Sequence, residues 1–410
     1  MTTTPGHVRL RPWMRSLGAQ AGTALGYLLA TQLSSHAAMT HPHMASVWPP
    51  AGFALGIVLL VGSRLWPGLA LGAVVAALPS VSWPGAIAFA VGCTLAALLG
   101  AAGLRRIGFH LCLDRARDAV ALIGIGALVS PIISSTIGVA GLHFAGDLPV
   151  ERVGPIWLRW WTGDAVGILL VTPLMLAWWP GRSAGLPPAR RAEVVALAIS
   201  LVAASAVFLR IPAGYEYALF PLVGWAAIRL GPRGASAATA LVAAIAIWHA
   251  VQGIGPFATS PQDDSLLRLR VFLGLLATAS LVMAAMSMEQ RRAAGALRSS
   301  ELRFQRIFEH AGVGIGVVGP DGRIAVANPA LQQMLGFSAA ELAERTIADV
   351  THAEDLREEE PLLADVLAGR RTNYRMVKRY RRKDGTVFWG RLTAIFMPRG
   401  GGGGALRERL

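Results

Sequence analysis

Long apolar runs, separated by short polar gaps, fill the chain from about residue 17 to residue 288. A helix needs about 20 mostly apolar residues to cross the hydrocarbon layer of a bilayer, which is about 30 Å thick. Ten runs have this character: 17–38, 48–62, 65–79, 83–104, 119–141, 160–179, 192–210, 216–230, 234–251 and 268–288. Three of them are short for a full crossing. The pattern therefore predicts an all-α polytopic membrane bundle with about eight to ten transmembrane helices.

The arginines between these runs predict how the chain is threaded. With ten crossings and a cytoplasmic start, 16 arginines fall on the inner side and five on the outer side. This excess agrees with the rule that positive residues are retained in the cytoplasm. The first run follows three arginines as a signal peptide would, but the runs after it favour a retained helix. We expect a multi-pass protein of the bacterial inner membrane, with a cytoplasmic tail at residues 1–16 and both termini in the cytoplasm.

Composition divides the chain into two regions. The whole chain is 54% hydrophobic and 15% charged, whereas soluble domains carry about 25% charged residues. Residues 1–298 hold 21 Lys and Arg and 10 Asp and Glu, and residues 299–410 hold 17 and 14. The second region therefore has the composition of a soluble domain, with a boundary near residue 290. The net charge of +14 does not indicate nucleic acid, because membrane topology explains the arginines.

One segment, Trp157 to Pro173, places ionisable and aromatic residues together at the start of an apolar run. An ionisable group at membrane depth is costly and usually faces protein or water. The segment predicts a ligand or proton site formed by Asp164, Arg159, Trp157, Trp160 and Trp161. The alternative is a belt of interfacial tryptophans with an aspartate that caps a helix. Two cysteines and scattered histidines give no metal-binding pattern.

Three motifs carry a resemblance to a known family. They are Trp48-Pro-Pro-Ala-Gly-Phe-Ala-Leu-Gly, the Arg64–Ala73 segment with Trp-Pro-Gly, and Trp157–Trp178 with Arg-Trp-Trp-Thr-Gly-Asp. Residues 17–288 resemble the MASE1 family of bacterial membrane-associated sensor domains. The resemblance implies a sensor placed before a cytoplasmic module such as a diguanylate cyclase or a histidine kinase. It names neither the signal nor a cofactor.

Residues 289–311 predict a connector helix. From Met283 to Ala311, apolar and small residues alternate at spacings of three and four, which is the spacing of a coiled-coil seam. Two polar members and two alanines weaken this seam. The pattern indicates either a parallel homodimer through the connector or a plain linker helix.

The following residues, 312–397, resemble a PAS domain. The resemblance rests on one run, Asn328 to Leu342, and on a second, Tyr380 to Trp389. The motif positions are Asn328, Gly336, Phe337, Glu341, Asp384, Gly385 and Trp389. The family implies an α+β fold with a five-stranded antiparallel sheet, in which the last strand of the sequence lies in the middle, beside the first.

The end of the chain predicts an incomplete PAS domain. Five glycines follow Arg399, and glycine has no side chain to pack in a strand. We therefore expect residues 398–410 to form a Gly-rich irregular tail and the central strand to be missing. This pattern suggests a truncated or frame-shifted chain, whose longer relatives carry an output domain.

The sequence predicts a sensor that passes a signal from a transmembrane bundle to the PAS module and to an output domain absent from this chain. The chain has no cyclase loop, kinase nucleotide box or P-loop, so we expect no enzymatic activity. The expected partners are the lipid bilayer, a second copy of the chain and a signalling protein, without nucleic acid. Two alternatives stay open: a proton-coupled transporter of small molecules and a scaffold that recruits a partner protein.

Overall fold

A computed structural model describes residues 12–36, 47–179, 188–211, 214–258, 262–319, 321–368, 370–397 and 405–409 of the chain. The backbone divides into two compact units, Met1–Arg292 and Ala293–Leu410. The division lies within the longest helix, so each unit contains one part of it. Most of the expected N-terminal tail lies outside the described residues.

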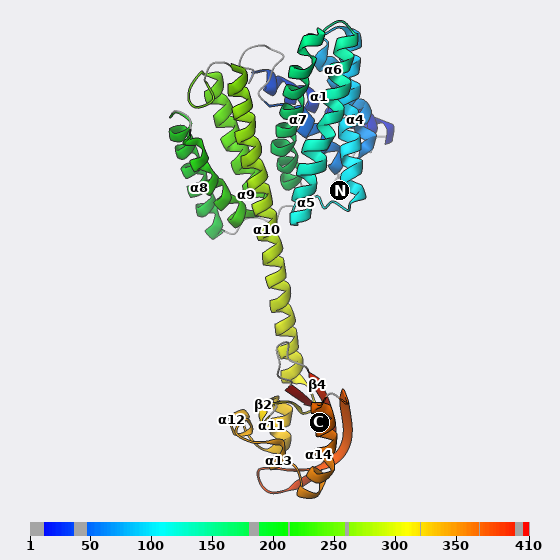
Figure 1. Cartoon of the computed structure of the whole chain (residues 1–410), viewed down its shortest axis with the longest axis vertical. Coiled ribbons are helices and arrows are strands. Elements are labelled where there is room, and N and C mark those ends of the chain that lie inside the picture. Colours follow the sequence, from blue (N-terminus) through cyan, green and yellow to red (C-terminus); the bar gives the residue numbers. More distant parts are fainter. Residues whose placement is uncertain are drawn as a thin grey trace, which may run out of the picture. The chain divides into compact units, whose positions relative to one another are not determined.

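The described part of the first unit is helical. Its elements are α1 (Pro12–His36), α2 (Pro49–Leu60), η1 (Ser63–Leu65), α3 (Trp66–Ala77), α4 (Trp83–Arg106), α5 (Ala116–Ala121), the π-helix η2 (Leu122–Val129), α6 (Ser130–Phe144), α7 (Val150–Trp178), α8 (Pro188–Phe208), η3 (Glu216–Leu219), α9 (Phe220–Val251) and α10 (Gln262–His310). Figure 1 shows α4, α6 and α7 side by side, and α8 beside α9. Prolines occupy the first turns of α2, α3 and α4, where a missing backbone N–H costs nothing.

Six helical segments in the described residues are long and apolar enough to cross a membrane. They are Trp83–Arg106, Ala116–Phe144, Val150–Trp178, Arg191–Phe208, Glu216–Val251 and Asp264–His310. Two shorter apolar helices, Pro49–Leu60 and Ser63–Ala77, accompany them. The chain is therefore a multi-pass membrane protein, and the expected number of crossings stays a prediction.

Helix α9 is in fact a hairpin of two arms. Gly231 has the non-helical torsions φ 66° and ψ −152°, and Pro232 follows it. Before this turn the chain runs parallel to α10, since Gly224 faces Met283 and Gly231 faces Met288. After it the direction reverses, because Thr239 lies 2.9 Å from Ser280. The two arms match the separate runs 216–230 and 234–251 of the sequence.

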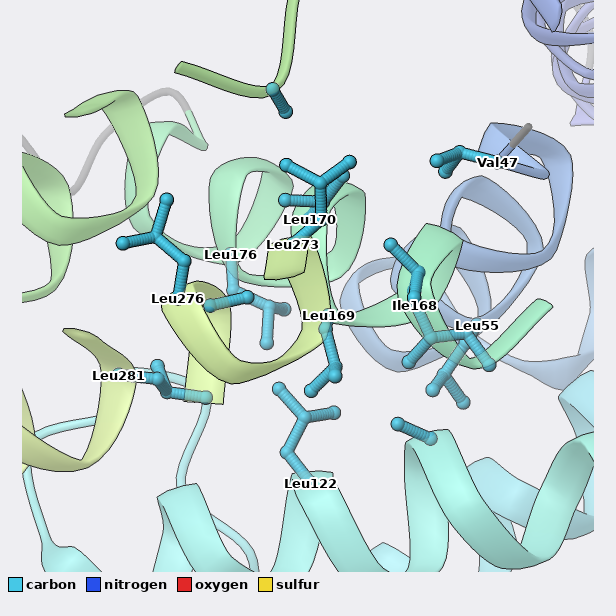
Figure 2. Packing of buried hydrophobic residues seen from close by; sticks show 14 of the residues in the cluster. Val47, Leu55, Leu122, Ile168, Leu169, Leu170, Leu176, Leu273, Leu276 and Leu281 are labelled. Carbon is cyan, nitrogen blue, oxygen red and sulfur yellow. The ribbon is translucent and has the colours of Figure 1, made fainter. Parts of the chain in front are cut away.

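A continuous apolar core joins the helices of the first unit. Leucines of α7 and α10, among them Leu169, Leu176 and Leu273, meet in this core (Figure 2). Helices α2 and α7 approach closely because glycines face the contact: Gly52 lies against the Gly167 carbonyl, and Gly167 lies against the Trp48 carbonyl. Close backbone packing between α2 and α7 thus explains the glycines in both sequence motifs.

The second unit is a sheet covered by short helices. After the last turns of α10 come β1 (Ile315–Val318), β2 (Ile324–Ala327), α11 (Pro329–Leu335), α12 (Ala339–Ala343), α13 (Ile347–Val350), α14 (Ala353–Leu367), β3 (Asn373–Arg381), β4 (Val387–Met397) and β5 (Ala405–Arg409). The strand order is β2-β1-β5-β4-β3, and all neighbours are antiparallel. In the β3–β4 hairpin, Arg379 is paired with Trp389.

The expectation that the central strand is missing is wrong. Residues Ala405–Arg409 form β5, which pairs with β1 on one side and with β4 on the other. Strand pairing uses backbone N–H and C=O groups, and the strands β1 and β4 both offer unpaired ones at this place. The glycines lack side chains to pack, but the five residues that follow them pair through their backbone. Residues 398–404 lie outside the described part.

Candidate functional site

The first unit contains a cavity of about 340 Å³ among its helices. Helices α4, α7 and α10 supply most of its walls, and the loops before α4 and α7, Trp48 before α2 and Leu142 of α6 supply the rest of the described lining. The charged residues of this described lining are Asp147, Arg152, Arg159, Asp164 and Arg270. A cavity of this size, mostly apolar and with a few convergent polar groups, is typical of a small-molecule site.

One face of α7 builds the longest wall of the cavity. Arg152, Ile156, Arg159, Trp160, Gly163 and Asp164 all line it, and each follows an earlier member by three or four residues, which places them on one side of a helix. Helix α10 contributes Arg270 and, one turn earlier, Leu266. The local helical pattern therefore fixes which charges meet at the cavity.

The deepest charged groups are Asp164 and Arg270, which are 7% and 6% exposed. The Ser134 hydroxyl of α6 donates to Asp164 Oδ2 at 2.6 Å. The Arg270 guanidinium donates to Thr162 Oγ1 of α7 at 2.9 Å. Three helices thus meet at this point through polar contacts, and each contact lies beside the cavity.

An aromatic wall closes another side of the cavity. Phe89 packs edge-on against Trp48 at 6.1 Å and against Trp160 at 5.5 Å between ring centroids. Edge-to-face packing of this kind stabilises a rigid apolar surface. The same three rings also line an adjoining cavity of about 300 Å³, which reaches Thr31 and Gln32 of α1.

The structure divides the five residues proposed from the sequence. Asp164, Arg159 and Trp160 line the cavity. Trp157 and Trp161 stack on each other at 6.2 Å and do not line it. Their indole groups donate instead to Thr136 Oγ1 at 3.1 Å and to the Leu128 carbonyl at 2.8 Å, so they tie α7 to α6 and η2.

Several lining residues lay outside the sequence hypothesis. Arg270, Trp48, Phe89 and Cys93 come from three other segments of the chain. One signal was present, since Arg270 interrupts the apolar run 268–288, and an arginine in such a run is unusual. Only the fold brings it within reach of α7.

Residues 114–118 and 284–292 form what we call the base of the first unit. There α10 contacts two neighbouring segments, the start of α5 and the first arm of α9. The Ala116 N–H at the start of α5 donates to Glu289 Oε2 at 3.0 Å, and Arg292 forms an ion pair with the buried Asp114. Arg291 donates to the Ile228 carbonyl in the first arm of α9 at 2.9 Å. Ion pairs and caps at helix ends fix position more than they add stability.

Arginines cap helix ends elsewhere in the first unit. Arg105 donates to the Val58 carbonyl near the end of α2, and Arg233 donates to the Ala177 carbonyl near the end of α7 at 3.0 Å. The last carbonyls of a helix lack partners within it, and a cation there complements the helix dipole. The arginines used to predict topology therefore also have a structural role.

In the second unit, the PAS motif residues hold turns and caps. Asn328 is fully buried, accepts from the N–H groups of Ile315 and Leu331, and donates to the carbonyls of Phe308 and Val313. It thereby fastens the end of α10 to β1 and α11. Gly336 ends α11 with a left-handed φ of 76°, a conformation that favours glycine.

The remaining motif residues lie near the β3–β4 hairpin or face it. Glu341 forms a capping box with Ser338 and an ion pair with Lys383 at 2.5 Å. Phe337 is buried beneath the Arg345 guanidinium, 4.3 Å from its ring centroid. Asp384 and Gly385 form the turn, and Trp389 is exposed with Arg379 over its ring at 5.3 Å.

A polar cluster fills the core of the second unit. The Lys378 ammonium lies 2.6 Å from Glu359 Oε2 and 3.0 Å from Thr351 Oγ1, and Tyr374 donates to Glu359 at 2.8 Å. All four residues are buried. Within the described residues, no group of three or more His, Cys, Asp or Glu is placed to hold a metal ion.

Comparison with known proteins agrees with this division. The MASE1 family model matches residues 17–291, which is more than half of the chain. The chain belongs to the MASE1 family. The PAS fold model matches residues 302–405 and thus reaches into β5. The MASE1 region and the PAS region together make the protein a membrane sensor for signal transduction.

Two curated relatives share parts of the chain. The "Probable diguanylate cyclase DgcE" of Escherichia coli (strain K12) is 26% identical over 359 residues, which cover 84% of this chain and 31% of that protein. The "Sensor histidine kinase TmoS" of Ectopseudomonas mendocina is 28% identical over 102 residues, or 25% of this chain and 10% of that one. The chain therefore spans about a third or less of these relatives.

Two solved structures of PAS domains are similar to part of the chain. A PAS domain from a two-component sensor histidine kinase is 18% identical, with a TM-score of 0.23, and covers 27% of this chain and 96% of its own. The PAS domain of an HTR-like protein from Haloarcula marismortui is 22% identical, with a TM-score of 0.25, and covers 29% of this chain and 98% of its own.

Proposed function

We propose that the cavity of the MASE1 region is the sensory site and that α10 carries its state to the PAS module and to an output domain. The observation that supports this most is the placement of three groups on one helix. Arg270 lines the cavity, Glu289 and Arg292 dock on the segment around α5, and the last turns of α10 are fastened by Asn328. A small rotation or shift of α10 changes all three contacts.

A second route joins the cavity to the same base. Ser134 of α6 holds Asp164, and α6 continues backwards through η2 and α5 to Ala116, which binds Glu289. The intervening η2 is a π-helix, a form that is rare and often found at functional positions. We propose η2 as the place where this route shifts register. Both routes meet at the base of the first unit, where Glu289 and Arg292 of α10 contact the segment around α5.

The output is proposed from the relatives. One is named a probable diguanylate cyclase and the other a sensor histidine kinase. We infer that this chain supplies sensing and that cyclase or kinase activity belongs to a domain outside it. On the arginine count, the protein lies in the bacterial inner membrane with both termini in the cytoplasm.

Dimerisation through the connector is part of this proposal. Leu297, Phe304 and Ile307 fall on the predicted seam, and each is more than half exposed in the single chain. Large apolar side chains in a row at heptad spacing favour pairing with a second copy. Met283, the first seam position, faces Gly224 of α9, so we place the start of the paired seam further along.

The test is a fusion of the full chain to a diguanylate cyclase domain, with cellular cyclic-di-GMP as the readout. We expect Arg270→Gln to change the output at least about threefold, because it alters the polar contact between α10 and α7. Arg268→Gln is the matched control, since Arg268 is exposed and does not line the cavity. Arg292→Gln should weaken the effect of the Arg270 change. If output ignores all variants of the first unit while the fusion is active, the proposal is wrong.

A further inference from the structure

We propose that the cavity binds a small organic anion with an apolar body, and that Arg159 and Arg270 hold its charged group. This inference rests on the sensory role proposed above and adds the chemical class of the ligand. It stands on the charges of the lining, their burial and the aromatic wall.

The described lining carries more positive than negative charge. In this part of the structure three arginines and two aspartates line the cavity, so their formal sum is +1. The arginines form a series of decreasing exposure: Arg152 is exposed, Arg159 is half-buried and Arg270 is buried. Among the described residues, no acid is found in an ion pair with Arg152. An anion that enters along this series meets a guanidinium at each depth.

Both aspartates already have hydrogen-bond donors from the protein. Asp147 Oδ2 accepts from the Ser82 backbone at 3.1 Å and from the Ser82 hydroxyl at 2.6 Å, which fixes the loop before α7 to the start of α4. Asp164 accepts from Ser134, which does not line this cavity. Among the described lining residues the guanidinium groups outnumber the carboxylates by one, and in a region of low dielectric a positive lining favours a bound anion.

The apolar part of the ligand follows from the remaining walls. Trp48, Phe89 and Trp160 make a rigid surface that is shared with the adjoining cavity. A flat or branched hydrocarbon body packs against these rings while a carboxylate or phosphate reaches the guanidinium groups. Gly163 leaves room there: a methyl group at its position would be 3.7 Å from the Arg270 guanidinium.

The ligand has two conceivable sources with this same chemistry. One is a free organic acid, and the other is an anionic lipid whose headgroup enters the cavity from the bilayer. The two are distinguished by competition. The protein is assayed in nanodiscs of phosphatidylcholine alone and in nanodiscs that also contain phosphatidylglycerol.

The experiment is calorimetric titration of the full chain in phosphatidylcholine nanodiscs. The four probes share a phenyl ring on a three-carbon chain and differ in their polar groups. These probes are 3-phenylpropanoate, 3-phenylpropan-1-ol, 3-phenylpropan-1-amine and phenylalanine, and each is titrated to about 10 mM. We expect the anion to bind at least about tenfold more tightly than the other three. Loss of anion binding when phosphatidylglycerol is added assigns the site to a lipid headgroup, and its persistence assigns it to a free acid. Both outcomes uphold an anion site.

Variants locate the binding. Arg270→Gln should weaken the anion at least about tenfold, whereas Arg268→Gln, two residues away on the exposed face, should stay within about twofold. Arg159→Gln lies at intermediate depth and provides a second test if Arg270→Gln does not fold. Equal or tighter binding of the alcohol, the amine or phenylalanine would overturn the inference, as would no binding of any probe. Binding without any change in the fused cyclase would leave the ligand class standing and refute the sensory role.

Discussion

Both units of the protein bury an acid and a base, but in opposite settings. In the PAS unit, Lys378 and Glu359 are 0% and 1% exposed and bind each other directly at 2.6 Å. In the MASE1 unit, Asp164 and Arg270 are buried to a similar degree, and each binds a hydroxyl on a neighbouring helix beside an open cavity. Burial alone therefore does not distinguish a structural pair from a site. The partner and the adjacent space do.

The largest expected effect concerns the closed pair. Lys378→Met leaves the Glu359 carboxylate buried without its cation, which should lower the free energy of unfolding of the PAS unit by about 3–5 kcal/mol. Amide exchange across β3 and β4 in the full chain measures this loss. The double variant Lys378→Met with Glu359→Leu should recover most of it. A double variant as unstable as the single one would show that the pair is needed for more than mutual neutralisation.

Two glycines of α7 sharpen the contrast between packed and open surfaces. Gly167→Ala pushes a methyl group against the Trp48 carbonyl, so it should destabilise the α2–α7 contact by about 1–3 kcal/mol. Gly163→Ala meets only ordinary contacts of 3.7 Å or more and should cost less than about 0.5 kcal/mol. Thermal unfolding in nanodiscs compares the two. Equal losses would mean that the cavity is not open at Gly163.

Trp161→Phe tests whether this tryptophan belongs to the cavity or to the packing. It removes the indole bond to the Leu128 carbonyl, which should cost about 1 kcal/mol of stability. The same change at Trp160 removes part of the cavity wall. We expect Trp160→Phe, and not Trp161→Phe, to weaken binding of 3-phenylpropanoate. The reverse order in the titration would contradict the geometry.

The smallest effect lies at the PAS surface and depends on pH. The Lys383 ammonium, and next the Ser338 backbone N–H, lower the pKa of the Glu341 carboxyl from 4.5 to about 2. Because the folded pKa is the lower one, this stabilisation is complete above pH 4.5 and is lost as the pH falls toward 2. Over this window the protection of amides 338–343 against exchange, taken relative to the intrinsic exchange rate at each pH, should fall in the natural chain. Glu341→Gln should remove the pH dependence, and a dependence that survives would have another origin.

Much of the fold follows from local patterns. The runs 216–230 and 234–251 are separated by Gly231 and Pro232, and the structure turns the chain there. Asp164, Arg159 and Trp160 are predicted together because a single helix face fixes their relation. The capping residues Asn328, Ser338 and Gly336 likewise act through neighbours in the sequence.

The parts that were not predicted depend on distant contacts. Arg270 reaches the cavity only because α10 packs beside α7, and no local pattern fixes that choice. The glycines before β5 predict irregular backbone, but pairing with β1 and β4 gives its five residues a strand conformation. Trp157 and Trp161 share a sequence motif with Trp160 but point to other partners. In each case the tertiary partner, and not the residue type, sets the role.

The most direct test of the account is amide exchange of the base of the MASE1 unit, at residues 114–118 and 284–292, in the full chain in nanodiscs. If α10 links the cavity to this base, Arg270→Gln should change exchange there at least about threefold, while Arg268→Gln should match the natural chain. Identical exchange at the base in all three proteins, with the Arg270 variant folded, would contradict the claim that the cavity sets the state of α10.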